Sequence, residues 1–470
     1  MIFDTLVLST FFFLMGIFSI LSKDSLWSNR LYAFWFLSIG LLSLPLLWLI
    51  QRVGFDYSFA FLHVVGSFIT LSSNVAIFQS LPHTSLFLWQ KSTLLACILP
   101  LIIFFNQTLS KPGHLRFAAL NAVLFVVIAG LVFVVSSQLV VIFFSFELLL
   151  LSSLYLLRLT AKSERIGEAV TEMFFWTLAG SIFLFVGFIL YLSEGIMSLD
   201  QVRSSLKSTN LASLMFLLGF GVKLPIWPCF SWLLKAHVEA SVEFSILLSG
   251  VIVKFGALGV YKFINQAGFL INNQLLMACS LLGVMEASFR LLGQRDIKRI
   301  VALTTVIELN WIGFCVAKGG LLFDQIGAYL LVAHSFTTSS EFFLVECLYK
   351  RYHTRDYVFI SGVANAMPAL WLMSLLAVLV TVGFPGTSLF TAKLLFLANL
   401  ASISVLIFIV FMLFFLLFIP VFFIRLWVPI WFGTQGSRAK FDISTREALL
   451  LSLSIVLSFI IGLCPALVID

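Results

Sequence analysis

Apolar runs of about 20 residues, separated by short polar connectors, recur along the whole chain. A helix of this length crosses a hydrocarbon core about 30 Å thick. The pattern therefore predicts an all-α membrane protein with about fourteen transmembrane helices. They cover residues 1–21, 31–50, 85–106, 117–136, 139–158, 171–192, 211–234, 242–264, 273–292, 299–317, 321–348, 369–396, 401–428 and 447–468.

The segment 53–80 fits this pattern less well than its neighbours. Asp56, His63, the run Ser72–Asn74 and Gln79 interrupt its apolar residues. We interpret it as interfacial or irregular structure, with a further helix as the alternative.

The composition excludes a soluble protein. Of the 470 residues, 61% are hydrophobic and 10% are charged, whereas soluble domains have about 45–50% apolar and about 25% charged residues. The net charge of +7 comes from basic residues spread over the connectors, so it does not indicate a nucleic-acid partner. The six cysteines form no CxxC pair, so we expect no disulfide framework, metal site or redox centre in this chain.

Lysine and arginine are concentrated in the connectors that follow odd-numbered predicted helices. These connectors hold Lys23, Arg30, Lys111, Arg116, Lys162, Arg165, Lys235, Arg295, Lys298, Lys350, Arg351, Arg355, Arg438, Lys440 and Arg446. The connectors after even-numbered helices hold only Arg52, Arg203, Lys207 and Lys318. By the positive-inside rule, the odd connectors face the negative compartment and both termini face the positive-potential side.

Ionisable residues occur at the centres of several predicted helices. They are Glu147, Lys223, Lys254, Glu308, His334 and Lys393. A central charged residue costs about 2.5–3.5 kcal/mol on insertion scales, so the six together cost on the order of 10 kcal/mol, comparable to the stability of a whole domain. A cost of this size indicates either compensating partners or a function.

Two interpretations of these groups are open. A glutamate and a lysine or arginine can neutralise each other and serve only packing, which is the interpretation we favour for Glu286 and Arg290 at i,i+4 spacing. For the six central groups we favour a proton path. Carboxylate, imidazole and ammonium alternate along the chain, and burial weakens the preference of each group for its charged form.

Helix-breaking residues interrupt two of the predicted helices. Pro225 and Pro228 follow Lys223 and remove two backbone donors at mid-membrane depth. Carbonyl groups freed there are tolerated only beside protein or water, so the break predicts a wet cavity. The stretch TVGFPGTSLFTAK, residues 381–393, forms the second interruption.

Paired interruptions are typical of transporters built from inverted repeats. We therefore divide the chain into peripheral N-terminal helices, a first antiporter-like half, a second inverted half, and a C-terminal connector with the last helix. These parts are, in order, residues 1–116, 117–264, 273–428 and 429–470. In this register Glu147 corresponds to Glu308, and Lys223 corresponds to Lys393.

Two features are expected to connect the halves. Lys254 lies among small residues, including Gly250 and Gly256, that let neighbouring helices approach closely. His334, Thr338 and Glu341 recur at i, i+4 and i+7 and form one polar stripe on an apolar helix. Together they predict a lateral route for a proton.

Several motifs resemble those of a known family. The stretch KLPIWPCFSWLLKAHVEASVEFSILLSGVIVKFGALGVYKF, residues 223–263, is similar to the signature of the NADH dehydrogenase subunit 4 family, the antiporter-like membrane subunits of respiratory complex I. Its element His237–Ala240 separates this family from two sister families of antiporter-like chains. DIKRIVALTT at 296–305 and AHSFTTSS at 333–340 resemble further motifs in the expected order, and the resemblance covers residues 117–396.

The resemblance implies an antiporter-like fold with two inverted five-helix repeats and discontinuous helices seven and twelve. It also implies a proton channel driven by quinone reduction elsewhere in complex I, in the mitochondrial inner membrane or, as an alternative, the bacterial plasma membrane. NADH, FMN, iron–sulfur clusters and ubiquinone would belong to other parts of the complex, with none bound by this chain. The implied partners are other membrane-arm subunits, especially the sister antiporter-like chains, and lipids.

The proposed proton-carrying residues follow the family with two departures. The residues that match the family's glutamate, two lysines and histidine are, in order, Glu147, Lys223, Lys254 and His334. The family has a histidine where this chain has Glu308 and a glutamate where it has Lys393. We interpret the two changes together as an acid–base couple whose ends are exchanged.

Two alternatives to a complex I subunit stay open. A cation/proton antiporter subunit would share the fold and the buried lysines and glutamates. A structural membrane scaffold would use the same charges only as pairs. Substitution of Glu147 or Lys223 distinguishes a scaffold from a proton channel. A scaffold would lose assembly together with activity, whereas a channel would lose pumping alone.

Overall fold

The computed structural model describes eight stretches of the chain. They are residues 85–108, 111–160, 164–204, 210–265, 270–401, 404–414, 419–433 and 441–469. The predicted helices 1–21 and 31–50 and the segment 53–80 lie outside these residues. All the described residues belong to one unit, Ala76–Asp470.

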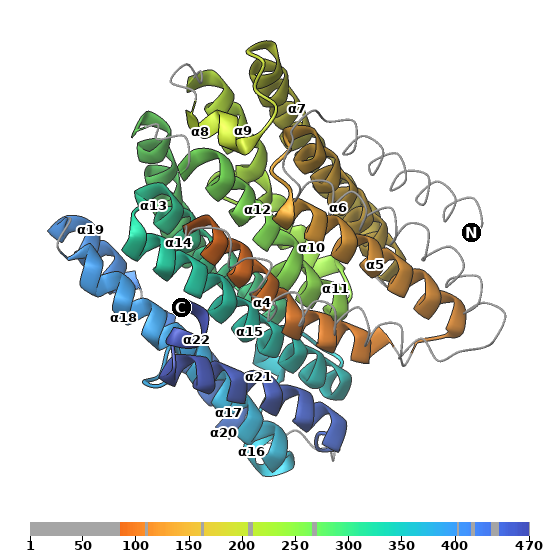
Figure 1. Cartoon of the computed structure of the whole chain (residues 1–470). Helices are drawn as coiled ribbons and strands as arrows, with labels where there is room; N and C mark the ends of the chain where they lie inside the picture. The colour runs from red at the N-terminus through yellow and green to blue at the C-terminus, as the bar shows by residue number, and fades with distance from the viewer. Residues whose placement is uncertain are drawn as a thin grey trace. The chain divides into compact units, whose positions relative to one another are not determined.

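The first four described helices agree with the spans that the apolar runs predicted (Figure 1). They are α4 Ser85–Thr108, α5 Gly113–Val135, α6 Leu139–Thr160 and α7 Ile166–Ser193. Helix α5 packs on α6, and α7 packs on both α6 and α9 Asn210–Lys223. A short helix, α8 Leu199–Ser204, follows.

The predicted span 211–234 is broken where the prolines stand. Helix α9 Asn210–Lys223 ends at the lysine, and α10 Ser231–Glu239 begins beyond Pro228. Side chains bind two carbonyl groups freed at the break: Trp232 Nε1 donates to Val222 O (3.1 Å), and Asn310 Nδ2 donates to Pro225 O (3.3 Å). Protein groups therefore satisfy part of the interrupted backbone.

The next span is continuous but irregular. It consists of α11 Val242–Leu247, η2 Leu248–Ile252, α12 Val253–Val260 and η3 Tyr261–Asn265, and both η segments are π-helical turns. The first π turn directly precedes Lys254, and such turns occur frequently at functional sites. A Cβ atom on Gly256 would lie 2.8 Å from Leu224 N. The predicted close approach of helices around Lys254 is therefore confirmed.

The longest helix lies at the centre of the described unit. Helices α13 Leu270–Leu292 and α14 Ile297–Lys318 pack against each other, and α14 packs on α15 Leu321–Tyr352. Helix α15 also contacts α4, α11, α18 Ser388–Leu400 and α21 Thr445–Leu463. Burial of α15 on several sides explains how its polar stripe is kept away from lipid.

The predicted span 369–396 is also broken. After the short η4 Tyr357–Phe359 and α16 Val363–Ala366, α17 runs over Pro368–Val382 and α18 over Ser388–Leu400. Gly383 ends α17 in the left-handed conformation (φ 81°), which glycine adopts at little cost. Thr387 begins α18 by accepting a hydrogen bond from Phe390 N (3.4 Å).

The C-terminal helices depart from the predicted boundaries. Helix α19 Val405–Met412 lies within the predicted span 401–428, whereas α20 Ile419–Phe432 begins within it and ends beyond it, with 415–418 outside the described residues. The last span is α21 Thr445–Leu463, followed by α22 Ala466–Ile469. Ser444 and Glu447 form a capping box at the start of α21, which fixes this boundary.

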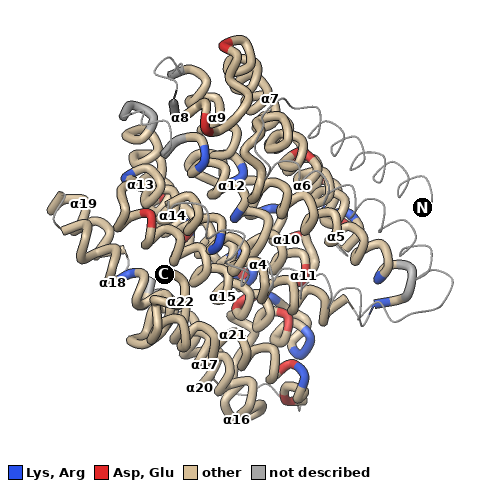
Figure 2. The backbone as a smooth tube through the Cα atoms, viewed as in Figure 1, with Lys and Arg blue, Asp and Glu red and all other residues tan. Residues whose placement is uncertain are grey.

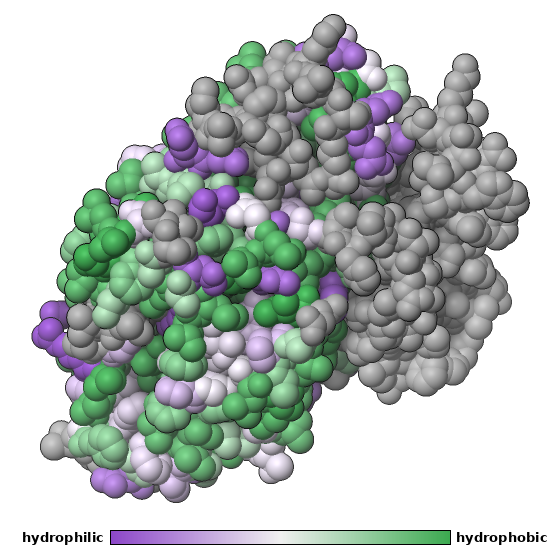
Figure 3. Space-filling view, turned by 60° about the vertical axis from the view of Figure 1, so that its left-hand side comes forward, coloured by the Kyte–Doolittle hydropathy of each residue, from purple (hydrophilic) through white to green (hydrophobic). Residues whose placement is uncertain are grey.

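Large apolar residues are exposed on the surface, whereas several charged residues are buried inside. Within the described residues, eight helices are long and apolar enough to cross a bilayer, and four shorter apolar helices accompany them. The space-filling view has a wide hydrophobic face (Figure 3), and α7 exposes Phe175, Ile182 and Phe185. Acidic and basic residues also occur along the inner helices around α12 and α15 (Figure 2). The protein is a multi-pass membrane protein with buried charges.

Candidate functional site

Two of the predicted groups lie together on α6 and α9. Glu147 is half-buried, accepts a hydrogen bond from Ser181 on α7, and interacts electrostatically with Lys223. Lys223 is 3% exposed, and its ammonium stands 4.9 Å from the centre of the Trp232 ring. Among the described residues, neither Glu147 Oε1 nor Lys223 Nζ has a hydrogen-bond partner. The pair is thus close enough to interact without being locked together.

A second group is contributed by three different helices. Lys254 on α12 and His334 on α15 are fully buried, and Lys254 Nζ hydrogen-bonds His334 Nδ1. The other ring nitrogen, Nε2, lies 3.8 Å from Oε2 of Glu308 on α14. The structure thus brings an ammonium, an imidazole and a carboxyl into one line.

Lys393 continues this group towards the second broken helix. It is 4% exposed, and Nζ donates to Thr381 O (3.3 Å) and Val382 O (3.1 Å), the last carbonyls of α17. The C-terminal end of a helix carries partial negative charge, which favours a cation there. Glu308 interacts electrostatically with both Lys393 and Lys254. The buried charges compensate one another across α12, α14 and α18.

The two groups meet through backbone rather than through a direct polar contact. A Cβ atom on Gly256 would lie 3.2 Å from Lys223 Cβ, so the end of α9 packs on the helix that carries Lys254. Within the described residues, no hydrogen bond joins Lys223 Nζ to another group. A proton that moved between the two lysines would therefore need a carrier between them.

Several buried basic groups were not singled out in the sequence. Lys262 donates to three carbonyls at the end of α5, those of Phe133 (2.6 Å), Val134 and Ser136 (both 3.1 Å). Lys298 donates to Ala240 O (2.5 Å). Both lysines bind carbonyl groups at the C-terminal end of a helix. Lys262 lies two helical turns beyond Lys254, and this spacing was the signal for a second buried lysine on the same face.

His237 is another buried group. Its ring stacks on Phe342 with centres 4.7 Å apart. Neither of its ring nitrogens has a hydrogen-bond partner among the described residues. The family signature drew attention to this residue in the sequence, but its complete burial follows only from the packing of α10 against α14.

Two further ion pairs are more exposed to the surface than the buried groups are. The predicted pair of Glu286 and Arg290 is confirmed (2.5 Å), and Trp227 Nε1 also donates to Glu286 (2.6 Å). Lys235 Nζ lies 2.5 Å from Glu172 Oε2, and this hydrogen bond raises the pKa of the lysine above its ordinary value.

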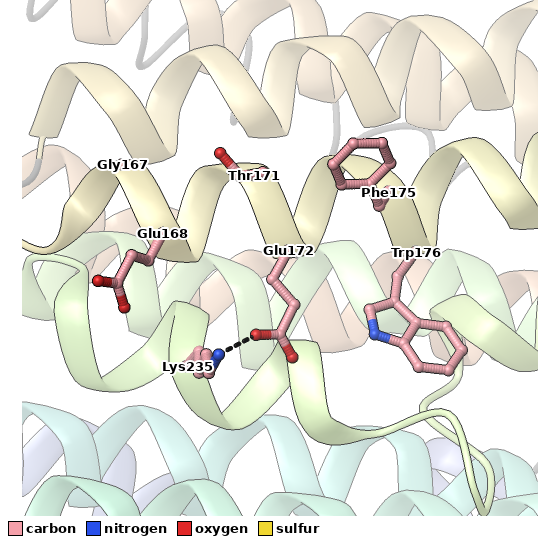
Figure 4. A pocket seen from close by; sticks show the side chains of 7 residues that line it. All are labelled: Gly167, Glu168, Thr171, Glu172, Phe175, Trp176 and Lys235. Carbon is pink, nitrogen blue, oxygen red and sulfur yellow. Dashed lines mark ion pairs between the residues drawn. The ribbon is translucent and has the colours of Figure 1, made fainter.

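The Lys235–Glu172 pair lines an open depression of about 620 Å³ between α7 and α10, with Glu168 and Trp176 beside it (Figure 4). None of the six predicted groups lines this depression. The depression is therefore separate from the buried charges.

A metal centre is not apparent in the part of the chain that the structure describes. No three His, Cys, Asp or Glu side chains gather there as a metal site would require. The expectation that cofactors belong to other parts of a complex stays a prediction.

Comparisons with known proteins agree with the fold. The chain is 33% identical to NADH-ubiquinone oxidoreductase chain 4 of Paramecium tetraurelia over 53% of this chain and 54% of that protein. It is 27% identical to the chain of the same name from Chondrus crispus over 85% of this chain and 81% of that one. It thus spans about half the length of the Paramecium relative and more of the Chondrus relative.

Solved structures are similar in fold. A chain in respiratory complex I from Thermus thermophilus with bound NADH matches with a TM-score of 0.71 at 22% identity, over 82% of this chain and 81% of that chain. A chain in the Mrp complex from Dietzia matches with a TM-score of 0.69 at 17% identity, over 81% and 82%. The predicted all-α, antiporter-like fold is confirmed, and the described residues contain both predicted discontinuous helices.

The model of one protein family matches residues 136–419, the part of the chain that holds all six predicted groups. That region covers more than half of the chain and includes both broken helices. The chain belongs to the family described as NADH:quinone oxidoreductase/Mrp antiporter, TM.

Proposed function

We propose that this chain is a proton-translocating membrane subunit of an NADH:ubiquinone oxidoreductase, respiratory complex I. Curated relatives carry the names NADH-ubiquinone oxidoreductase chain 4 and NADH-quinone oxidoreductase subunit M. Quinone reduction takes place in another part of the complex, and this chain uses the released energy to move protons. NADH, FMN, iron–sulfur clusters and ubiquinone are bound by other subunits.

The observation that carries this proposal is the line formed by Lys254, His334 and Glu308. The Lys254 ammonium donates to the lone pair of His334 Nδ1. When Nδ1 takes that proton, the ring becomes an imidazolium and can release the proton of Nε2 towards the Glu308 carboxylate 3.8 Å away. Because the two ring nitrogens exchange roles, histidine can relay a proton without moving far.

Glu147 and Lys223 form the ion pair whose separation delivers a proton to the line that begins at Lys254. While the carboxylate is near, Lys223 keeps its proton, and when the two separate the ammonium loses its partner and releases it. Moving one charge against about 100 mV costs about 2.3 kcal/mol, which changes in buried ion pairs can supply. The missing hydrogen bonds of Glu147 Oε1 and Lys223 Nζ within the described residues support a pair that can change its spacing.

The line ends at Lys393. Its ammonium is held by the last carbonyls of α17 and faces the charge of Glu308. A proton passed from Glu308 to a neutral Lys393 reaches the broken region between α17 and α18. This is the exit of the second half of the protein.

The division of residues 117–264 and 273–428 into two halves is supported by a pair of similar bridges. Gln138 pairs with Ser198 and Asp296 pairs with Asp356, both antiparallel and both at the same separation along the chain. Each bridge stands directly before a spanning helix, α6 or α14. The remaining parts of this proposed division are residues 1–116 and 429–470.

The proposed setting is the mitochondrial inner membrane, with the bacterial plasma membrane as the alternative. Relatives come from mitochondria-bearing organisms such as Chondrus crispus and from bacteria such as Rhodobacter capsulatus. The odd connectors face the negative compartment, and both termini face the positive-potential side. The partners are the other membrane-arm subunits, sister antiporter-like chains and lipids.

Substitutions in the assembled complex test the proposal. Glu147→Gln and Lys223→Met should lower the number of protons moved per quinone reduced in proteoliposomes, while blue-native gels find the complex assembled. Arg290→Gln serves as a control, because it changes an ion pair outside the line. Loss of assembly in parallel with loss of activity would instead identify a scaffold. Sodium-driven proton exchange by the complex without quinone would identify a cation/proton antiporter.

A further inference from the structure

Glu341 is a second buried carboxyl beside the Glu308–Lys393 pair. It lies on α15, two helical turns beyond His334, and is 4% exposed. It interacts electrostatically with Glu308 and Lys393 and hydrogen-bonds Thr381. Its Oε2 has no geometrically sound hydrogen-bond partner among the described residues. A carboxyl so placed is unusual for a residue that serves only packing.

Two threonine hydroxyl groups, on α17 and α14, lie beside Glu341. Thr381 Oγ1 donates to Ala377 O (3.0 Å), and Thr304 Oγ1 donates to Val301 O (2.8 Å). A hydroxyl has one hydrogen to donate and two lone pairs to accept with. Each hydroxyl can therefore donate to an ionised Glu341 or accept from a protonated one. The two threonines thus provide hydrogen-bonding groups for Glu341 in either protonation state.

The charges around Glu341 favour a proton that stays on one of two neighbouring carboxyls. Glu308, Glu341 and Lys393 are two carboxyls and one amine, all buried. Two ionised carboxylates in one buried site repel each other, so one of them keeps a proton. When Lys254 has given up its proton, one proton shared by Glu308 and Glu341 leaves the cluster neutral in total, because the other carboxylate balances Lys393. The proton can change places between the carboxyls at little electrostatic cost.

A small cavity also borders Glu341. Its volume is about 10 Å³, the lower limit for one water molecule. The walls are mostly apolar, with Val301, Val378 and Trp427 among them. Within the described residues, the Trp427 Nε1 donor is buried without a hydrogen-bond partner. Glu341 and Trp427 thus both line the cavity.

A merely structural role would leave Glu341 paired. Glu447, at the start of α21, shows what such pairing looks like: Arg351 Nη2 lies 2.8 Å from its Oε2, and Lys350 Nζ lies 3.5 Å from its Oε1. Glu346 lies on α15 with Glu341 and faces Lys350 at 3.9 Å. Glu341 differs from both because it shares the single ammonium of Lys393 with Glu308 and also borders hydroxyl groups and a cavity.

We propose that Glu341 is a further proton-carrying residue, which passes protons between the Glu308–Lys393 pair and the cavity beside Trp427. This inference rests on the proposed proton translocation and adds a branch to its route. A protonated Glu341 gives its proton to a water molecule in the cavity and is recharged from Glu308. The Trp427 N–H holds that water in place by donating to its oxygen.

Glu341→Gln tests the inference in the assembled complex. The amide keeps the shape and the hydrogen bonds of a neutral carboxyl but cannot release a proton, so proton translocation should fall about tenfold, below the roughly 10²–10⁴-fold that a positioned proton carrier contributes. Glu341→Asp should recover part of the loss. Glu346→Gln, on the same helix, should leave translocation unchanged. Full translocation with Glu341→Gln would overturn the inference.

Infrared spectroscopy supplies a readout that does not depend on pumping. The C=O stretching band of a protonated carboxyl should be present in the wild-type complex and absent with Glu341→Gln, whereas an unchanged band would contradict the proposal. Thr381→Val, which removes a hydroxyl that bonds the carboxyl, should shift that band. If Glu147→Gln and Lys223→Met also leave translocation intact, the proposed function itself fails. If they lower it and Glu341→Gln does not, only the role of Glu341 fails.

Discussion

Lys223 and Lys393 belong to two broken helices, and they lie on opposite sides of their breaks. Lys223 is the last residue of α9, before the break. Lys393 lies on α18, after the break, but its Nζ reaches back to the last carbonyls of α17. Both lysines are thus associated with the C-terminal end of a helix segment, where a cation is favoured. The position in the sequence differs, while the electrostatic setting is alike.

The carboxyl partners differ more. Glu147 is half-buried and faces Lys223, whereas Glu308 is buried between Lys254, His334 and Lys393. Counted from the bridges Gln138–Ser198 and Asp296–Asp356, Glu308 stands about one helical turn further along its helix than Glu147 does. That extra turn places it against His334. The comparison teaches that the Glu147–Lys223 couple is open to rearrangement, whereas Glu308 belongs to the proposed relay formed by Lys254, His334, Glu308 and Lys393.

The Glu308–Lys393 couple should therefore be more sensitive to substitution than the Glu147–Lys223 couple. Lys393→Met leaves the buried Glu308 without its ammonium partner, and we expect proton translocation to fall by about 10²-fold or more. The measurement is the number of protons moved per quinone reduced in proteoliposomes, with assembly checked on blue-native gels.

A double variant sharpens this expectation. Glu308→His with Lys393→Glu restores the order of acid and base that the family resemblance describes, so it should recover much of what either single variant loses. Equal loss in the double and single variants would mean that the two positions do not act as a couple. Unchanged translocation with Lys393→Met alone would remove Lys393 from the route.

The histidine provides the next largest effect. His334→Phe keeps an aromatic ring on α15 but removes both nitrogens between Lys254 and Glu308, so translocation should fall by about tenfold or more. His237→Phe is the matched control, because His237 is equally buried and its ring stacks on Phe342 without bonding a member of the relay. Equal losses in both variants would point to packing rather than proton transfer.

A smaller effect is expected where the two groups meet. Gly256→Ala forces a methyl group against Leu224 N, which a Cβ atom would approach to 2.8 Å. Such overpacking costs about 1–3 kcal/mol, so the thermal unfolding midpoint of the purified protein should fall. Gly167→Ala is the control, since a Cβ atom there has nothing within 4 Å. An unchanged midpoint with Gly256→Ala would contradict the close packing of α9 on α12.

The smallest effect should come from the surface pair. Lys235→Ala removes the partner of Glu172 outside the relay, so translocation should stay at the wild-type level. The folded-state pKa of Lys235 is raised, so the stabilisation by this pair is complete below the ordinary lysine pKa of 10.5 and is lost as the pH rises through the higher folded value. Thermal unfolding between pH 6 and pH 9 should therefore show no change that depends on Lys235. A large loss of translocation would bring the depression into the route.

Much of the fold was predictable because membrane helices are long apolar runs. The spans from α4 to α7 and both broken helices follow from the spacing of apolar residues, prolines and glycines. The π turns in the span Val242–Asn265 were not predictable, because they add one residue to a turn without leaving a sequence signal. The boundaries of α19 and α20 were missed because apolar residues continue across them.

The candidate site was predictable in its members but not in its contacts. The cost of burying charge singled out Lys254, Glu308 and His334 one by one. Their meeting depends on how α12, α14 and α15 pack, and periodicity cannot fix which faces of different helices touch. Lys262 and Lys298 were missed because both stand near connectors, where a lysine is ordinarily exposed.

The most direct test is the number of protons moved per quinone reduced by a complex that carries Lys254→Met. Lys254 is fully buried, and its one hydrogen bond among the described residues is to His334, so its loss interrupts the line at a single point. A proton path through these residues predicts an assembled complex that moves fewer protons for each quinone. An assembled complex with the wild-type number of protons per quinone would contradict it.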